Sequence, residues 1–183
     1  MNLVGHMLIA SKTCELLEKE YGLAVNRPAF MLGNVLPDTS FRMKRPVHRI
    51  DNWGDRVNLM IDDLETGMSV SNRRYSLRLG VVCHFVSDFF CLAHNDAYYL
   101  KQIAHFIYET RQSKEFIRLK RSDENFDPSL FIPPDMDVIA YIAERHKAFI
   151  SNEVTYEREF SDSVEICASI CGTLIAEGIL LPA

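Results

Sequence analysis

Apolar residues recur at helical spacing along most of the chain. Leu, Ile, Val, Phe, Ala and Cys stand three and four positions apart with charged residues between them, and no convincing alternation typical of strands is found. The pattern predicts an all-α protein.

Glycine, proline and asparagine divide this pattern into separate elements. Gly22 ends the first helix, Pro28 suits the first turn of the second, and Pro37 is expected to break that second helix. Asn72 is a candidate cap for the fourth. Helices are expected at about 4–21, 28–35, 53–66, 72–94, 97–120, 135–157 and 161–178, with a basic loop at 36–52 and a polar connection at 121–134. No repeat or linker interrupts them, so residues 1–183 are predicted to form a single-domain helical bundle.

Composition narrows the classes of function. The chain has 183 residues, of which 48% are hydrophobic, enough for a substantial core without disulfides. Its net charge of −5 argues against a general nucleic-acid binder, so no stable nucleic-acid complex is expected.

Three features of the sequence bear on where the protein is located in the cell. The five cysteines form no C-x-x-C pair and fall in apolar helical patterns, which indicates buried thiols in a reducing compartment. The N-terminus does not resemble a signal peptide, and no apolar run is long enough for a transmembrane segment. A cytoplasmic protein is expected.

Ionisable residues lie in the most apolar part of the chain. His84, Asp88, His94, His105 and Glu109 stand among Val, Phe, Leu and Ile, where a buried ionisable group is costly unless it is paired. Histidine with carboxylate is a typical zinc ligand set, and i,i+4 spacing lets two side chains reach one ion. A satisfied core histidine or a buried His84–Asp88 pair would explain single members. The full set favours a metal cluster, with His84, Asp88 and His94 on one face of a continuous helix and the last two ligands on a neighbouring helix.

Upstream residues extend this pattern. His6 lies in GHMLIA, Asp38 ends GNVLPD, and His48 lies in the basic loop. With HFVSDFFCLAH and HFIYE, these residues resemble the zinc-dependent phospholipase C family, which is related more distantly to the S1/P1 nucleases. The order His, Asp, His, then His-x3-Asp-x5-His, then His-x3-Glu is kept over residues 6–109.

The resemblance implies a ligand set for each ion. A first zinc would be held by Asp38, His48, His84 and Asp88, a second by His94, His105 and Glu109, and a third by His6 with Asp88 as the bridge. Family enzymes complete the third site with the amine and carbonyl of an N-terminal Trp that removal of a leader exposes. This chain begins with Met1, and its only Trp is Trp53. Two zinc ions are therefore expected, and a third only if Met1 folds back to replace that Trp.

The resemblance also implies the chemistry. We expect a zinc-dependent phosphoric ester hydrolase that cleaves a phosphodiester, either a small ester or a phospholipid, with a metal-activated water. Asp38 is expected to act as ligand or general base. Arg45 and Arg49 of the basic loop are candidate phosphate contacts, although a solvated loop is as good an interpretation. Tyr98 and Tyr99, beside the helix break, are candidate substrate contacts.

Two rival functions stay open, an S1/P1-like nuclease and a non-catalytic metal-binding or partner-binding protein.

Three further predictions concern the positions of other residues in the fold. His146, in a charged stretch, is expected at the surface. The aromatic residues Phe85, Phe89, Phe90, Tyr98, Tyr99 and Phe106 are more typical of a core than of a substrate pocket, and the cations Arg118, Lys120 and Arg121 are expected at a helix end.

Overall fold

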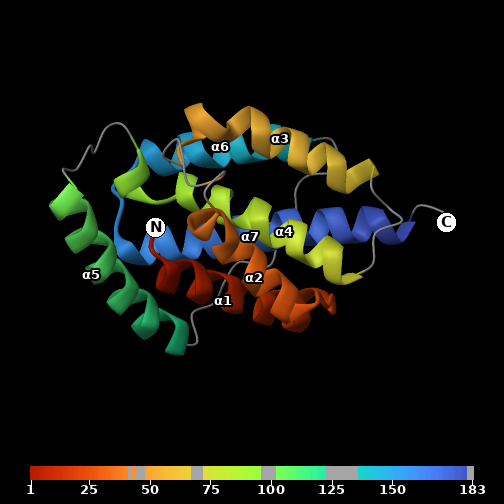
Figure 1. The fold of residues 1–183 in the computed structure, drawn as a ribbon, viewed down its shortest axis with the longest axis horizontal. Helices are drawn as coiled ribbons and strands as arrows, with labels where there is room; N and C mark the ends of the chain where they lie inside the picture. The colour runs from red at the N-terminus through yellow and green to blue at the C-terminus, as the bar shows by residue number, and fades with distance from the viewer. Residues whose placement is uncertain (41–42, 44–47, 67–71, 96–101, 123–135, 181–183) are drawn as a thin grey trace.

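The fold was examined in a computed structural model, which describes residues 1–40, 43, 48–66, 72–95, 102–122 and 136–180. Throughout these residues the regular structure is helical, as the sequence predicts (Figure 1). The helices are α1 (Leu3–Tyr21), α2 (Arg27–Thr39), α3 (Ile50–Thr66), α4 (Asn72–Phe89), the 3-10 turn η1 (Leu92–His94), α5 (Gln102–Arg121), α6 (Val138–Ile150) and α7 (Tyr156–Leu180).

Helix α4 is the centre of the bundle. Its second half, from Leu79 to Phe89, is buried on every side, because α2, α3, α7 and α1 all pack against it. The closest of these contacts is with α2, where Gly33 faces Gly80. A Cβ atom at either glycine would overlap a backbone carbonyl oxygen of the other helix. The glycines therefore set how near α2, which carries Asp38, comes to α4, which carries His84.

Helix α5 lies at one end of the molecule, against α1 and α7 (Figure 1). Its contacts with α1 run in parallel register. Asn2, the N-cap of α1, donates to the Glu109 carbonyl and accepts from the Ser113 hydroxyl, and further along Lys120 reaches the Ser11 hydroxyl. This packing brings the first residues of the chain beside the first turns of α5.

The thiols behave as the sequence predicts. All five cysteines are free and buried. Among the described residues, no helix combines the length and apolar character that a membrane span requires.

Two helix ends differ from the prediction. Helix α2 continues through Pro37 to Thr39, so Pro37 does not end it. A proline inside a helix removes one amide donor but leaves the following turn free to bond, and the Ser40 N–H still reaches the Leu36 carbonyl. Asp38 is thus held by a helix rather than by a loop. Helix α3 begins at Ile50, three residues before the predicted start.

The predicted helix 72–94 is interrupted. Helix α4 ends at Phe89, and His94 lies on η1. The Asn95 amide donates to the carbonyls of Phe89 and Cys91, which satisfies groups that the end of a helix leaves unpaired. His94 therefore does not share a helical face with His84 and Asp88.

The observed exposure of two side chains also differs from the prediction. His146 is buried rather than at the surface, and its Nε2 donates to the Asn95 oxygen at 2.9 Å. Phe106 is 70% exposed rather than part of the core, whereas Phe85, Phe89 and Phe90 are buried as predicted. The cations at the end of α5 lie in its last turn, as expected. The predicted helix 135–157 is shorter, Val138–Ile150, with Asp137 as its N-cap, and the last helix starts earlier, at Tyr156.

Candidate metal centre

Eight ionisable side chains from separate segments lie close together near the C-terminal end of α4. They are His6 of α1, Asp38 of α2, His48 just before α3, His84 and Asp88 of α4, His94 of η1, and His105 and Glu109 of α5. Three groups among them place their ligand atoms within 4.8 Å of one another: His6 with His84 and Asp88, Asp38 with His48 and His84, and His94 with His105 and Glu109.

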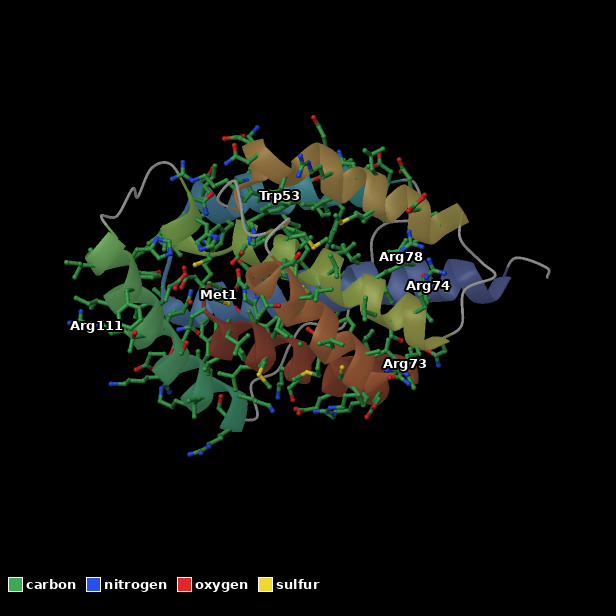
Figure 2. All side chains as sticks on the ribbon, viewed as in Figure 1. Met1, Trp53, Arg73, Arg74, Arg78 and Arg111 are labelled. Carbon is green, nitrogen blue, oxygen red and sulfur yellow. The ribbon has the colours of Figure 1, made fainter. Side chains whose placement is uncertain are left out.

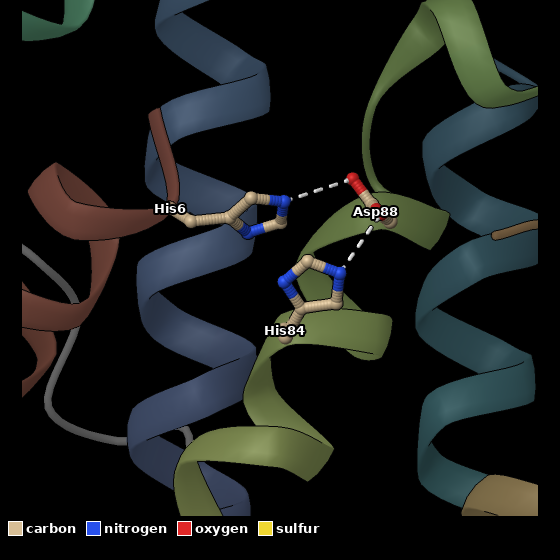
Figure 3. Close-up of side chains that lie close together, drawn as sticks. All are labelled: His6, His84 and Asp88. Atoms are coloured by element: carbon tan, nitrogen blue, oxygen red, sulfur yellow. Dashed lines mark ion pairs between the residues drawn. The ribbon is translucent and has the colours of Figure 1, made fainter. Parts of the chain in front are cut away.

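Asp88 links all parts of this cluster and is fully buried. Its Oδ1 lies 2.6 Å from the Met1 nitrogen and 3.4 Å from both His6 Nε2 and His94 Nδ1. Its Oδ2 lies 2.9 Å from His48 Nδ1 and 3.5 Å from His84 Nε2. Figure 3 shows His6 and His84 approaching this carboxylate from two different helices.

The spacing of these atoms suits a small divalent cation. Two ligand atoms about 2.1 Å from one tetrahedral zinc are about 3.4 Å apart. His94 Nε2 and Glu109 Oε1 are separated by 3.4 Å, and His84 Nε2 and Asp38 Oδ1 by 3.7 Å. Other pairs, such as His105 Nε2 and Glu109 Oε1 at 2.9 Å, are in direct hydrogen-bond contact.

Backbone carbonyls orient three of the histidines. His84 Nδ1 lies 2.7 Å from the Asn34 carbonyl, His48 Nε2 lies 2.8 Å from that of Met43, and His94 Nδ1 lies 3.2 Å from that of His48. Because a carbonyl oxygen only accepts, each of these nitrogens donates. The other ring nitrogen of His84 and of His94 then turns its lone pair toward the cluster, which is how proteins prepare histidine for a metal. His48 Nδ1 instead donates to Asp88 Oδ2 at 2.9 Å.

His6 gives the clearest sign of a missing partner. The Ser87 hydroxyl donates to the His84 carbonyl, so His6 Nδ1 donates to that hydroxyl at 3.1 Å. His6 Nε2 is left buried and without a hydrogen bond among the described residues, facing carboxylate oxygens of Asp88 and Asp38. A nitrogen lone pair opposite carboxylate oxygens requires a cation to be favourable, so the donor set fits a metal ion.

The amine of Met1 lies inside the same cluster, in the interior of the molecule (Figure 2). It is 2.6 Å from His94 Nε2 and 3.1 Å from Glu109 Oε1, besides its contact with Asp88. Burial favours the neutral amine, yet the carboxylates of Asp88 and Glu109 raise its pKa to about 12. As an ammonium it contributes a positive charge between two carboxylates, a charge that a divalent cation would also supply.

The electrostatics keep Asp88 and two of the histidines in metal-binding form, whereas the pKa of His48 is raised. Burial would lower the pKa of His48, but the hydrogen bond and charge of Asp88, with weaker contributions from other neighbours, outweigh it. Burial, and then the neighbouring His6, hold the pKa of His84 well below its usual value, and burial also lowers the pKa of His94. Burial by itself would raise the pKa of Asp88, but His94, the Met1 ammonium and His6 lower it well below the ordinary range. Neutral imidazoles and an ionised carboxylate are the forms that bind zinc.

Two members of the cluster are partly exposed to solvent. Asp38 and His105 are 30% and 28% exposed, whereas the side chains of His6, His84 and Asp88 are fully buried.

The structure thus brings together all eight residues that the sequence singled out for metal. Arg49 follows His48 and is partly buried at the start of α3, where its carbonyl accepts from the N–H groups of Asn52 and Trp53. Arg45, Tyr98 and Tyr99, also predicted to contact substrate, lie outside the described residues.

Sequence reasoning missed the residues that support the ligands. Asn34, Ser87 and Met43 orient histidines, and Trp53, fully buried, presents its ring edge-on to His48 at 5.5 Å. Glu159 of α7 is also buried and accepts from the Leu92 N–H and from the side chains of Tyr108 and Gln112. Most of these contacts use backbone atoms or neutral side chains, so no residue type in the sequence signals them.

Helical fold and ligand cluster together define the class: an all-α protein with a candidate multinuclear metal centre between its helices. The sequence model of the family described as zinc dependent phospholipase C matches residues 5–160, and the chain belongs to this family. No curated protein and no solved structure matches the chain at a significant level. Family and cluster support a general metal-dependent, phospholipase-like role.

Proposed function

We propose that this protein is a zinc-dependent phosphoric ester hydrolase that cleaves a phosphodiester, with a phospholipid as the preferred substrate class. The buried His6 Nε2 carries this proposal, because it faces two carboxylates without a hydrogen bond among the described residues. Family membership supports the choice of zinc.

The ligands would divide among the ions as the family resemblance implies. Asp38, His48, His84 and Asp88 would hold one zinc, and His94, His105 and Glu109 a second. A third would be shared by His6 and Asp88, with Met1 in the place of the family's Trp. The Met1 nitrogen lies 2.6 Å from Asp88, and it would have to release its proton to bind an ion there.

Bound zinc lowers the pKa of a coordinated water and stabilises charge on phosphoryl oxygens. The residues of the protein would hold the ions and orient the histidines that bind them. Asp88 would be among the residues that hold two of the ions, and the carbonyls of Asn34 and Met43 would orient the histidines that they contact. Asp38, partly exposed and within 4 Å of three histidine nitrogens, is better placed as a ligand than as a general base.

Four residues are proposed to contact the substrate. Arg49, beside His48, would meet a phosphate oxygen, and Arg45, Tyr98 and Tyr99 would flank the substrate. The substrate would be a small phosphodiester or a phospholipid, and the cytoplasmic location stays a prediction that none of these observations tests.

The test measures zinc content and turnover on the same sample. Zinc-loaded protein should hydrolyse a chromogenic phosphodiester and release the headgroup from phosphatidylcholine, with no more than weak action on single-stranded nucleic acid. Preferred hydrolysis of nucleic acid would favour the S1/P1-like nuclease instead. Stoichiometric zinc without turnover on any ester would favour the non-catalytic metal-binding protein.

A further inference from the structure

The exposed apolar side chains are unevenly distributed. Single exposed apolar residues are ordinary, whereas a group of them on one face indicates an interaction surface. Of the ten large exposed hydrophobic residues in the described part of the chain, seven belong to the first two turns of α1 and to α5: Leu3, Val4, Met7, Ile103, Phe106, Ile107 and Ile117.

The side of α5 that points away from the bundle is apolar in its first part and basic further along. Ile103, Phe106 and Ile107 are spaced i, i+3 and i+4 and therefore share a side, with Ile103 77% and Phe106 70% exposed. The same side continues through the exposed cations Arg111 and Lys114. Figure 2 shows Arg111 projecting outward from α5 at the end of the molecule. We call these five residues the α5 outer face.

The positive charge of this face indicates the kind of partner that it would bind. Helix α5 carries five Lys and Arg residues against two Glu, although the whole chain has a net charge of −5. Apolar tips beside cations on a surface helix are the features by which helices lie on anionic lipid, the tips entering the acyl region and the cations meeting phosphate groups. The net negative charge of the rest of the chain would turn this face toward such a surface.

Helix α5 carries two members of the candidate metal centre as well, on its inner side. His105, 28% exposed, lies between Ile103 and Phe106 in the sequence, and Glu109 is one turn further on. Asn2 joins the beginning of α1 to this part of α5. Ile103 and Ile107 lie on the opposite side of the helix from the two ligands, and Phe106, about 60° from Glu109 around the helix axis, is the member of the face nearest to them.

We propose that the α5 outer face docks the protein on an anionic phospholipid bilayer, with Phe106 and Ile103 inserted and Arg111 and Lys114 against the headgroups. This proposal rests on the proposed function, since a phospholipid substrate requires the protein to reach a lipid surface, and the apolar and basic side chains of the face fit such a surface. A second copy of the chain fits less well, because an isologous contact would bury Arg111 and Lys114 of both copies, and the face offers them no acidic partner.

Sedimentation with vesicles tests the proposal. Zinc-loaded protein should bind vesicles of mixed phosphatidylglycerol and phosphatidylcholine, more weakly in high salt, and much more weakly when the vesicles are pure phosphatidylcholine. Phe106→Ser and Ile103→Ser should each reduce partitioning about tenfold, the effect of removing one large apolar side chain from the lipid. Leu59→Ser on α3 is the matched control, because Leu59 is 67% exposed but lies on another helix. It should bind like the wild type, and circular dichroism should show all three variants folded.

Three results would overturn the proposal: wild-type protein that stays in the supernatant, Phe106→Ser and Ile103→Ser that bind as well as Leu59→Ser, or equal binding to both kinds of vesicle. A dimer in sedimentation velocity that Phe106→Ser dissolves would assign the face to a second copy instead. Hydrolysis of a water-soluble phosphodiester by the wild type separates the two proposals. Turnover without vesicle binding rejects docking alone, and vesicle binding without turnover rejects the enzymatic function alone.

Discussion

At the scale of single residues, Asp88 decides the behaviour of the ligand cluster. It is fully buried, and four nitrogen-bearing groups from other segments lie within 3.4 Å of its oxygens: Met1, His6, His48 and His94. A buried carboxylate with so many partners is costly to alter, because each partner loses its anion at once.

Asp88→Asn keeps the shape of the side chain and removes its charge. We expect phosphodiester turnover to fall by at least about 100-fold and zinc content to drop by more than one ion, because a change at a direct ligand exceeds the 10- to 100-fold effect of outer partners. Turnover and metal content of the purified variant measure both effects.

Glu109→Gln is the matched comparison, since Glu109 contacts only part of the cluster. It should empty mainly the site of His94 and His105. Wild-type turnover in Asp88→Asn would contradict the bridging role.

At the scale of elements, the distance between α2 and α4 is the most sensitive quantity. Gly80→Ala places a methyl group against the Phe30 carbonyl, so the helices must separate. We expect the free energy of unfolding to fall by about 1–3 kcal/mol, a typical cost of overpacking, and zinc affinity to fall as well, because Asp38 moves away from His84. Denaturant unfolding and zinc titration measure these changes.

Gly54→Ala on α3 serves as its control. The nearest atom to a Cβ there is Ile50 Cγ1 at 3.8 Å, so the methyl group fits. This variant should be as stable as the wild type or more stable by up to about 1 kcal/mol, since alanine favours a helix. Equal losses in both variants would rule out the close helix contact as the cause.

Glu159 joins α7 to the two elements that carry the second ligand group. It accepts from Leu92 N–H at 2.5 Å, from Tyr108 at 2.8 Å and from Gln112 at 2.9 Å. Glu159→Ala should loosen η1 and α5 and lower zinc occupancy at His94, His105 and Glu109. Glu159→Gln should retain the metal, because Gln112 can turn its amide and offer its oxygen, which forms no hydrogen bond among the described residues. Metal analysis distinguishes these outcomes, and equal zinc loss in both variants would contradict them.

The same carboxyl predicts a pH dependence. Burial raises the pKa of Glu159 from 4.5 to about 7, although its three hydrogen-bond donors oppose the shift. Between these pH values the folded state holds a proton that the unfolded state has released, so stability falls as pH rises. The fall amounts to about 3 kcal/mol by pH 8. Glu159→Gln should flatten this part of the curve of unfolding free energy against pH, and an unchanged slope would show that the carboxyl does not retain its proton.

At the scale of the whole molecule, metal and fold are coupled. The ligands come from α1, α2, α4, η1, α5 and His48, two residues before α3, so an ion bound among them ties most of the bundle together. A ligand present at 100 times its dissociation constant stabilises the folded state by about 2.7 kcal/mol. For a chain of this size, chelation should lower the melting temperature by about 5–10 °C. Calorimetry before and after confirmed zinc removal measures the shift, and an unchanged melting curve would favour a hydrogen-bonded network in place of metal.

The sequence by itself determined the all-α fold, the approximate helices and all eight residues of the cluster. Helical periodicity reports which side of a segment is apolar, and ionisable residues in an apolar stretch are conspicuous because their burial is costly. The order and spacing of His and carboxylate residues pointed to the family that the comparison of sequences then identified.

Only the tertiary structure decided how these residues meet. Continuation of α2 past Pro37, the break after Phe89 and the burial of His146 all depend on partners distant in sequence, such as Asn95 with the carbonyls of Phe89 and Cys91. The position of the Met1 amine beside Asp88 spans 87 residues of chain. Periodicity describes one segment at a time, whereas caps, carbonyl contacts and the orientation of each histidine arise when segments pack together.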